Sequence, residues 1–189
     1  RIAFAPMVFQ ATKSLRDSGL LKLVMDHEDS PLTLEEMSER LKLSLYAVRV
    51  LVEAGLGIGL ILLGKKGYAL SKTGYFIQED EMTRVNMDFS QDVCYLGLSQ
   101  LDASLKSGRP KGLSFLGNWE TIYQGLSKLP TKTQDSWLAF DHFYSNQAFP
   151  QALPLVFKKD QTPRYLLDIG GNTGKWATLC LNHHPEVQV

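Results

Sequence analysis

Residues 166–174, Leu-Leu-Asp-Ile-Gly-Gly-Asn-Thr-Gly, form the stretch that says most about the fold of this chain. An apolar run leads there into an acidic residue and a glycine-rich turn. Because glycine is needed where a backbone approaches a ligand closely or takes a positive φ, the pattern predicts a buried strand that opens into a nucleotide-binding loop. The stretch ends fifteen residues before Val189, the last residue. We therefore expect a cofactor-binding domain that begins here and is incomplete in this chain.

Spacing separates three glycine motifs that could explain this loop. The dinucleotide fingerprint G-x-G-x-x-G needs glycines at positions 170, 172 and 175, but the chain has Asn172 and Lys175 at two of them. The phosphate-binding pattern G-x-x-x-x-G-K-[ST] needs a glycine and a hydroxyl residue where the chain has Ile169 and Trp176. The pattern that remains is acid-x-Gly-x-x-x-Gly.

Asp168, Gly170 and Gly174 meet this third pattern, and on these residues the sequence resembles the first motif of class I S-adenosylmethionine-dependent methyltransferases. In the O-methyltransferase branch the motif most often has a central glycine where this chain has Asn172. Asparagine is the non-glycine residue that best adopts the left-handed conformation. The resemblance implies that Gly170, Gly171, Asn172 and Gly174 pass under the methionine part of the cofactor, and that Asp168 acts on its amino group.

The first 90 residues show the order helix, turn, helix, β-hairpin, which is typical of a winged helix. Thr33 and Glu36 form a capping-box pattern, and Ser44 is a suitable N-cap for the next helix, which we expect Gly55 to end. The turn-rich segment 64–67 predicts the hairpin. The expected helices cover residues 2–25, 34–41 and 45–54, and the expected strands cover 58–63 and 68–70.

Between the hairpin and the glycine loop we expect mostly helices. The polar segment 79–90 is expected to be a connection. The expected helices cover residues 91–106, 119–129 and 133–148, and Pro150 and Pro154 bracket a further helical turn or two. Helical spacing predicts the buried side of the first of these helices as Val93, Leu96, Leu98, Leu101 and Leu105.

O-methyltransferases of the plant and polyketide type carry a winged-helix dimerisation domain and a helical connection before the glycine motif. The chain is similar to them in the order of Ser107–Pro110, Trp119 and Trp137–Phe140. The resemblance implies a mainly α fold with a winged-helix N-terminal domain, followed by the first β-α unit of an incomplete Rossmann-like α/β domain. The implied domains are 1–90 for dimerisation, 91–162 for a helical connection that lines the active site, and 163–189 for the start of the S-adenosylmethionine-binding domain.

The same resemblance implies O-methylation of a small-molecule hydroxyl, phenolic or polyketide-like, by a homodimer that forms through the N-terminal helices. Methyl transfer from a sulfonium is a displacement, for which an enzyme supplies in-line positioning and usually a base. In the family, the helix before the cofactor strand forms a wall of the pocket, so Phe143, Tyr144 and Asn146 are the expected pocket residues. The family's base is a histidine much later in the chain, so we expect it beyond Val189 and expect His142 to be structural.

The other histidines and the two cysteines do not form a metal-site pattern. His183 and His184 are adjacent, so on a helix their side chains point about 100° apart, and no third ligand with suitable spacing is near. Cys94 and Cys180 are expected to be buried thiols in a reducing compartment. We therefore expect no metal.

A DNA-binding transcription regulator is the alternative, because winged helices often read DNA. A recognition helix needs basic and amide side chains that reach phosphates and base edges. The candidate helix offers Arg49, opposed by Glu53, and the preceding helix is acidic. This balance favours a dimerisation surface and makes nucleic acid an unexpected partner. A cofactor-free scaffold or pseudoenzyme stays open.

Composition is that of an ordinary globular protein, with 189 residues, 44% hydrophobic residues and a formal net charge of zero. No apolar run approaches the ~18 residues of a membrane span, and no signal peptide is visible, so we expect a cytoplasmic protein without membrane contact. The acidic residue that holds the ribose of the cofactor would lie just past Val189. We expect this chain to be a fragment of a longer enzyme, inactive alone.

Overall fold

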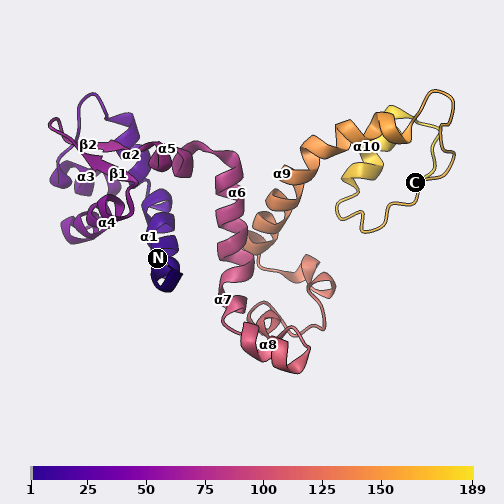
Figure 1. Cartoon of the computed structure of the whole chain (residues 1–189), viewed down its shortest axis with the longest axis horizontal. Coiled ribbons are helices and arrows are strands. Elements are labelled where there is room, and N and C mark those ends of the chain that lie inside the picture. The colour runs from indigo at the N-terminus through magenta and orange to yellow at the C-terminus, as the bar shows by residue number, and fades with distance from the viewer. Residues whose placement is uncertain (1) are drawn as a thin grey trace. The chain divides into compact units, whose positions relative to one another are not determined.

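Helices make up most of the N-terminal part of the chain (Figure 1), and capping residues and glycines set several of their ends. The computed structural model describes residues 2–189, which divide into two compact units between Gln91 and Asp92. The N-terminal unit contains η1 (Ile2–Phe4), α1 (Ala5–Asp17), α2 (Leu20–Asp26), α3 (Leu34–Leu41), α4 (Leu45–Ile58), β1 (Ile61–Leu63), β2 (Tyr68–Leu70), α5 (Lys72–Glu79) and α6 (Glu81–Phe89).

The predicted caps of α3 and α4 are confirmed. Thr33 Oγ1 accepts a hydrogen bond from the Glu36 amide (3.2 Å), and the Glu36 carboxylate accepts one from the Thr33 amide (2.7 Å). Ser44 Oγ accepts from the Ala47 amide at 3.2 Å. β1 and β2 pair antiparallel, with Ile61 opposite Leu70, as the hairpin prediction requires. The order of α3, α4, β1 and β2 is the predicted one, and the winged-helix assignment itself stays a prediction.

Two predicted boundaries in this unit are wrong. The helix expected over 2–25 breaks after Asp17, because Gly19 takes a φ of 80°. α4 does not end at Gly55 but continues to Ile58 and stops at Gly59, which has a φ of 86°. Gly55 lies inside the helix instead, where a Cβ atom would come within 2.7 Å of Ile61 Cδ1.

The segment 79–90, expected to be a connection, is helical. Ser71 Oγ accepts from the Gly74 amide (3.0 Å) at the start of α5, and an Asp80 carboxylate oxygen accepts from the Thr83 amide (2.7 Å) at the start of α6. The polar composition of residues 79–90 concealed α6 and its Asp80 cap, and among the residues of α6 only Val85 is fully buried.

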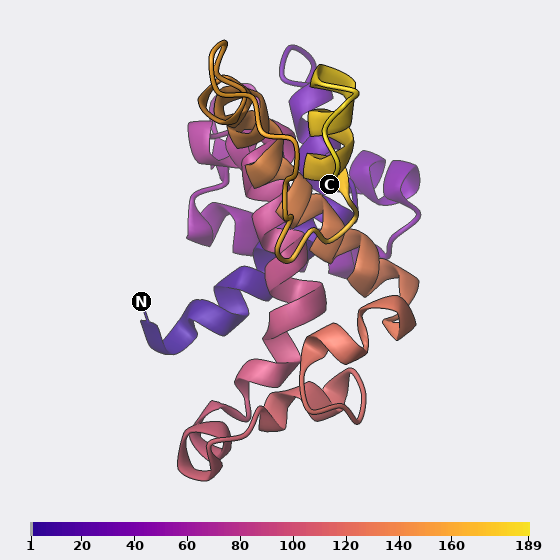
Figure 2. The ribbon, with the colours of Figure 1, turned by 90° about the vertical axis from the view of Figure 1, so that its right-hand side faces the viewer.

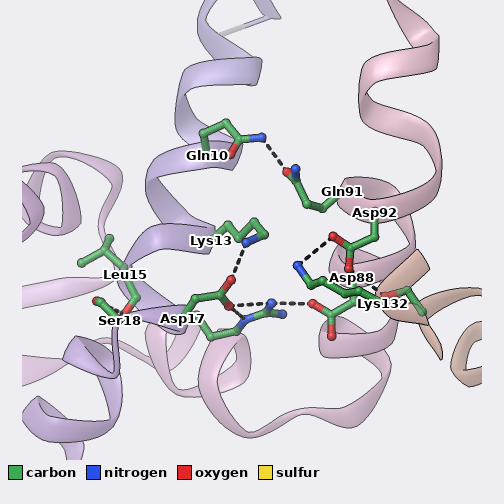
Figure 3. Close-up of polar contacts among 11 residues, drawn as sticks. Gln10, Lys13, Leu15, Asp17, Ser18, Asp88, Gln91, Asp92 and Lys132 are labelled. Atoms are coloured by element: carbon green, nitrogen blue, oxygen red, sulfur yellow. Dashed lines mark hydrogen bonds and ion pairs between the residues drawn. The ribbon is translucent and has the colours of Figure 1, made fainter. Parts of the chain in front are cut away.

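The core of the N-terminal unit joins helices and hairpin. Its buried members are Leu15, Leu20, Leu21, Val24, Leu32, Met37, Val48, Val52, Leu60 and Ile61. Polar contacts tie α1 to the end of the unit, where Arg16 binds Asp88 of α6 and Gln10 Nε2 donates to Gln91 Oε1 at 2.6 Å (Figure 3). Burial alone would raise the pKa of Asp17, but hydrogen bonds from Lys13 and Arg16 lower it.

The C-terminal unit begins within a π-helical turn at Ser90–Cys94 and is built mainly on one long helix. Its elements are α7 (Tyr95–Leu98), α8 (Leu101–Ser107), η3 (Lys111–Phe115), η4 (Ile122–Gln124), η5 (Leu126–Lys128), α9 (Thr131–Val156) and α10 (Lys175–His183). The Asp92 carboxylate holds the start of α9 by accepting from Lys132 Nζ (2.9 Å) and Ser136 Oγ (2.8 Å) (Figure 3).

The helix predicted over 91–106 is wrong as a single element, because it breaks at Ser99 and Gln100 between α7 and α8. Its predicted buried side is also wrong, since four of its leucines are more than half exposed. They are Leu96, Leu98, Leu101 and Leu105. α7 packs through Gly97 instead, so closely that a Cβ on Gly112 would lie 2.3 Å from the Gly97 carbonyl oxygen.

The helix predicted over 119–129 is replaced by the short turns η4 and η5. The Trp119 indole occupies the space beside Gly125, where a Cβ atom would come within 2.3 Å of the ring. α9 is longer than predicted and includes Pro150 and Pro154, which lack an amide donor. The helix continues because Leu153, Phe157 and their neighbours bury against α10, which runs beside its C-terminal part (Figures 1 and 2).

The buried strand predicted before the glycine loop is also wrong. Residues around Tyr165 form a single parallel bridge with Gln188, and Leu167 and Ile169 are more than 80% exposed. A parallel strand is buried only when strands flank it and helices cover both faces, and in the described residues only the segment at Gln188 pairs with it. The Rossmann-like assignment stays a prediction.

Candidate cofactor site

The glycine loop forms a tight turn between the Tyr165 bridge and α10. Gly170, Asn172 and Gly174 take φ angles of 75°, 49° and 72°, all in the left-handed region that favours glycine and, next to it, asparagine. The Gly174 amide donates to the Gly171 carbonyl at 2.7 Å, and α10 begins directly after it. The residue types of the motif are therefore those that this backbone requires.

Asp168 folds its carboxylate over the loop. A Cβ atom on Gly171 would lie 2.7 Å from Asp168 Oδ2, so only glycine leaves room for this position. Asp168 Oδ2 is buried and has no hydrogen-bond partner among the described residues. Burial raises the pKa of the nearby Cys180 thiol, and the Asp168 carboxylate adds to the rise. A buried carboxylate oxygen without a donor is a suitable place for a cationic or N–H ligand group.

A cavity of about 430 Å³ lies between the loop, α9 and α10. Its aromatic walls are Phe149 of α9 and Trp176 of α10, whose ring centroids are 5.2 Å apart. Its lining consists of Asp141, His142, Ser145, Phe149, Ala152, Asp168, Ile169, Gly170, Gly171, Asn172, Thr173, Lys175 and Trp176. The combination of an apolar wall, two carboxylates and exposed loop backbone suits a ligand that carries both an apolar part and an ammonium group.

Hydrogen bonds connect the loop to α9. Asn172 Nδ2 donates to Asp141 Oδ2 at 2.8 Å, and Trp137 Nε1 donates to the same oxygen at 3.0 Å. His142 Nε2 and Thr173 Oγ1 share a hydrogen bond of 3.0 Å. His142, expected to be structural, is thus both a partner of the loop and part of the cavity lining.

The predicted cofactor residues Asp168, Gly170, Gly171 and Asn172 line this cavity, and Gly174 marks the start of α10. Their contact with a cofactor stays a prediction. The predicted pocket residues take different places. Asn146 accepts a hydrogen bond from Lys175 Nζ and lines a neighbouring cavity of about 420 Å³. Phe143 and Tyr144 belong to the lining of neither cavity, and their rings pack against each other at 5.2 Å.

The α9 face of the cavity consists of residues that were not predicted from the sequence. Asp141, Ser145 and Phe149 follow one another at four-residue spacing, which places them on one side of the helix. That periodicity is visible in the sequence, but Trp137, Phe140 and Tyr144 also have helical spacing and define another side of the same helix. Only the position of the loop shows which side faces the site.

The adjacent histidines, His183 and His184, both lie against the Phe157 ring. In residues 2–189 no three His, Cys, Asp or Glu side chains are placed to hold a metal ion. Cys180 is buried and Cys94 is half-buried. None of the helices among the described residues combines the length and apolar character of a membrane span.

Comparisons with known proteins agree with this architecture. Residues 1–68 match the family of the Dimerisation2-like domain. A search of curated proteins gives no match. Among solved structures, the apo form of the S-adenosylmethionine-dependent methyltransferase SibL is 23% identical, with a TM-score of 0.65 over 98% of this chain and 54% of that one.

Two further structures show the same relation. The mitomycin 7-O-methyltransferase MmcR is 15% identical, with a TM-score of 0.68 over 98% of this chain and 54% of its own. Human N-acetylserotonin methyltransferase, solved with S-adenosylmethionine, is 14% identical, with a TM-score of 0.64 over 98% and 55%. The chain spans about half the length of these structures. The predicted resemblance is therefore confirmed at the level of the fold: residues 1–68 match the Dimerisation2-like domain, and the fold of the chain is similar to about half of these methyltransferase structures.

Proposed function

We propose that this chain is the dimerisation part and the first cofactor loop of an S-adenosylmethionine-dependent methyltransferase that acts on a small-molecule hydroxyl. The observation that carries the proposal is the buried Asp168 Oδ2, which has no partner among the described residues and lies at a cavity built on the glycine loop. The methionine part of S-adenosylmethionine carries an ammonium group, which can donate to this oxygen. The similar methyltransferase structures, of which human N-acetylserotonin methyltransferase was solved with S-adenosylmethionine, support the same cofactor.

The residues present fit such a cofactor. Gly170 and Gly171 leave the loop backbone open to the cavity, and a carboxylate at Asp168 compensates a positive charge in a poorly solvated position. The Phe149 and Trp176 rings form an apolar wall on one side of the cavity. S-adenosylmethionine would supply a methyl group on a sulfonium, and the part played by these residues is to hold and orient it.

We also propose that the N-terminal unit mediates homodimerisation. Ile2, Phe4 and Met7 at the start of the chain are more than 60% exposed, and apolar side chains in such number at one end of a helix favour burial against a partner. The exposed side of α4 includes Tyr46 and Val50, which suits a protein partner better than DNA.

Calorimetric titration of the purified chain with S-adenosylhomocysteine and, separately, with NAD tests the cofactor assignment. We expect S-adenosylhomocysteine to bind, NAD not to bind, and Asp168→Asn to weaken the first interaction while the protein stays folded. Binding of NAD in preference, or absence of S-adenosylhomocysteine binding by the folded chain, would overturn it. Light scattering at high protein concentration tests the dimer, and tight, salt-dependent binding of duplex DNA would favour the regulator instead.

A further inference from the structure

Asn172 occupies the centre of the glycine loop in a conformation that side chains rarely adopt. Its φ is 49°, between the left-handed glycines Gly170 and Gly174. Asparagine tolerates this region better than other non-glycine residues, but its backbone still has other conformations available. A side-chain contact that exists only in the left-handed state would therefore keep the loop in its closed shape.

Asp141 of α9 provides that contact. Its Oδ2 atom accepts from Asn172 Nδ2 at 2.8 Å and from Trp137 Nε1 at 3.0 Å. Trp137 lies four residues earlier on the same helix, so its indole fixes the direction of the carboxylate independently of the loop. The Asp141 backbone is fixed as well, because its carbonyl accepts from Ser145 Oγ at 2.7 Å.

The residues that follow Asp141 and Asn172 make a second connection between helix and loop, because His142 and Thr173 share a hydrogen bond of 3.0 Å. Two successive residues of a rigid helix thus hold two successive residues of the loop. We propose that Asp141 is a positioning residue, whose hydrogen bond with Asn172 holds the glycine loop in the shape that receives the methionine part of the cofactor. The inference rests on the proposed function and adds to it a residue outside the glycine motif.

Asp141 also lines the cavity, so its charge could attract a cationic ligand directly. The two roles differ in one respect that can be measured. A direct attraction acts whatever residue stands at position 172, whereas positioning requires the Asn172 amide. A double-mutant cycle over these two positions separates them, because it isolates the part of the effect that the pair shares.

The cycle compares the chain with Asp141→Ala, Asn172→Gly and the double variant, titrated with S-adenosylhomocysteine. Asp141→Ala should weaken binding about three- to tenfold, the equivalent of one lost hydrogen bond. Glycine adopts a positive φ without help, so Asn172→Gly should stay within about threefold of the parent chain. In the Asn172→Gly background, Asp141→Ala should change affinity by less than about twofold. An equal loss in both backgrounds, or no loss in either, would overturn the proposal.

Rescue provides a readout that general loss of structure would not give. Asn172→Asp places two carboxylates in contact and should open the loop, while the pair Asn172→Asp with Asp141→Asn restores a donor facing an acceptor and should recover most of the affinity. Failure of the pair to improve on Asn172→Asp alone contradicts the inference.

Amide hydrogen exchange without ligand keeps this inference separate from the proposed function. Asp141→Ala should speed exchange of the amides in segment 170–175, and much less so in the Asn172→Gly background. If the parent chain does not bind S-adenosylhomocysteine but exchange shows this pattern, the proposed function fails and the positioning role stands. If ligand binds and exchange is unchanged by Asp141→Ala, the positioning role fails alone.

Discussion

Gly171→Ala is the sharpest test of how the loop and Asp168 work together. The new Cβ atom would lie 2.7 Å from Asp168 Oδ2 and 3.1 Å from its Cγ, against an ordinary contact distance of at least 3.4 Å. Gly171 is not among the residues with positive φ, so alanine strains no backbone there. The carboxylate is the end of a flexible side chain and can turn away, which leaves the fold intact but moves the proposed partner of the cofactor's ammonium group.

The expected magnitude follows from the bond that is displaced. A hydrogen bond to a charged group contributes about 1.5–3 kcal/mol, and a displaced carboxylate keeps part of it. We expect a loss of about 1–2 kcal/mol, or roughly five- to thirtyfold weaker S-adenosylhomocysteine binding by calorimetry. The free energy of unfolding, measured with urea and circular dichroism, should change by less than about 0.5 kcal/mol.

Two control variants make the result decisive. Gly170→Ala meets no atom within 4 Å but must adopt a φ of 75°, so it should strain the loop by about 1 kcal/mol without displacing Asp168. In an Asp168→Asn background, Gly171→Ala should add little to the loss of affinity. If Gly171→Ala binds ligand as the parent chain does, or causes the same loss beside Asp168→Asn, the assigned role of Asp168 is wrong.

The other predictions concern the N-terminal unit and are measured by unfolding. Gly74→Ala should lower the free energy of unfolding by about 1–3 kcal/mol, because its Cβ atom would lie 2.2 Å from the Leu60 carbonyl oxygen. Gly57→Ala, whose Cβ atom would meet nothing within 4 Å, should be neutral or mildly stabilising. Equal effects of the two substitutions would contradict this. Thr33→Ala should cost about 1 kcal/mol by removing the capping box, and a serine there should restore it in thermal melts. The lowered pKa of Asp17 implies a contribution to stability that is present near neutral pH and is lost as the pH falls through that pKa. Asp17→Asn should therefore flatten the acid limb of the curve of unfolding free energy against pH. Parallel curves for the two proteins would refute this role of Asp17.

Local chemistry made parts of this structure predictable. The Thr33 capping box, the Ser44 cap and the hairpin turn depend on residues a few positions apart, whose preferred conformations survive in the folded chain. Ser71 and Asp80 carry the same kind of signal at the starts of α5 and α6, and the polar composition around Asp80 concealed the second of them. Errors of this kind come from composition, which reports exposure and says little about backbone hydrogen bonding.

Other parts depend on neighbours that periodicity does not identify. The leucines of α7 and α8 have the spacing of a buried face, yet they are exposed in the described chain, where α7 packs through Gly97. The apolar run before the glycine loop has the composition of a buried strand, yet Leu167 is 83% exposed, because a strand obtains its burial from the strands and helices around it.

The sequence alone determined the glycine loop, since glycine and, after it, asparagine most readily adopt the left-handed angles found at Gly170, Asn172 and Gly174. It also determined the order of helices and hairpin before that loop. Only the tertiary structure decided what surrounds the loop: Asp141 and His142 of α9 form hydrogen bonds with Asn172 and Thr173. The physical reason is range, because backbone preference acts within a few residues, whereas these contacts join side chains about thirty positions apart.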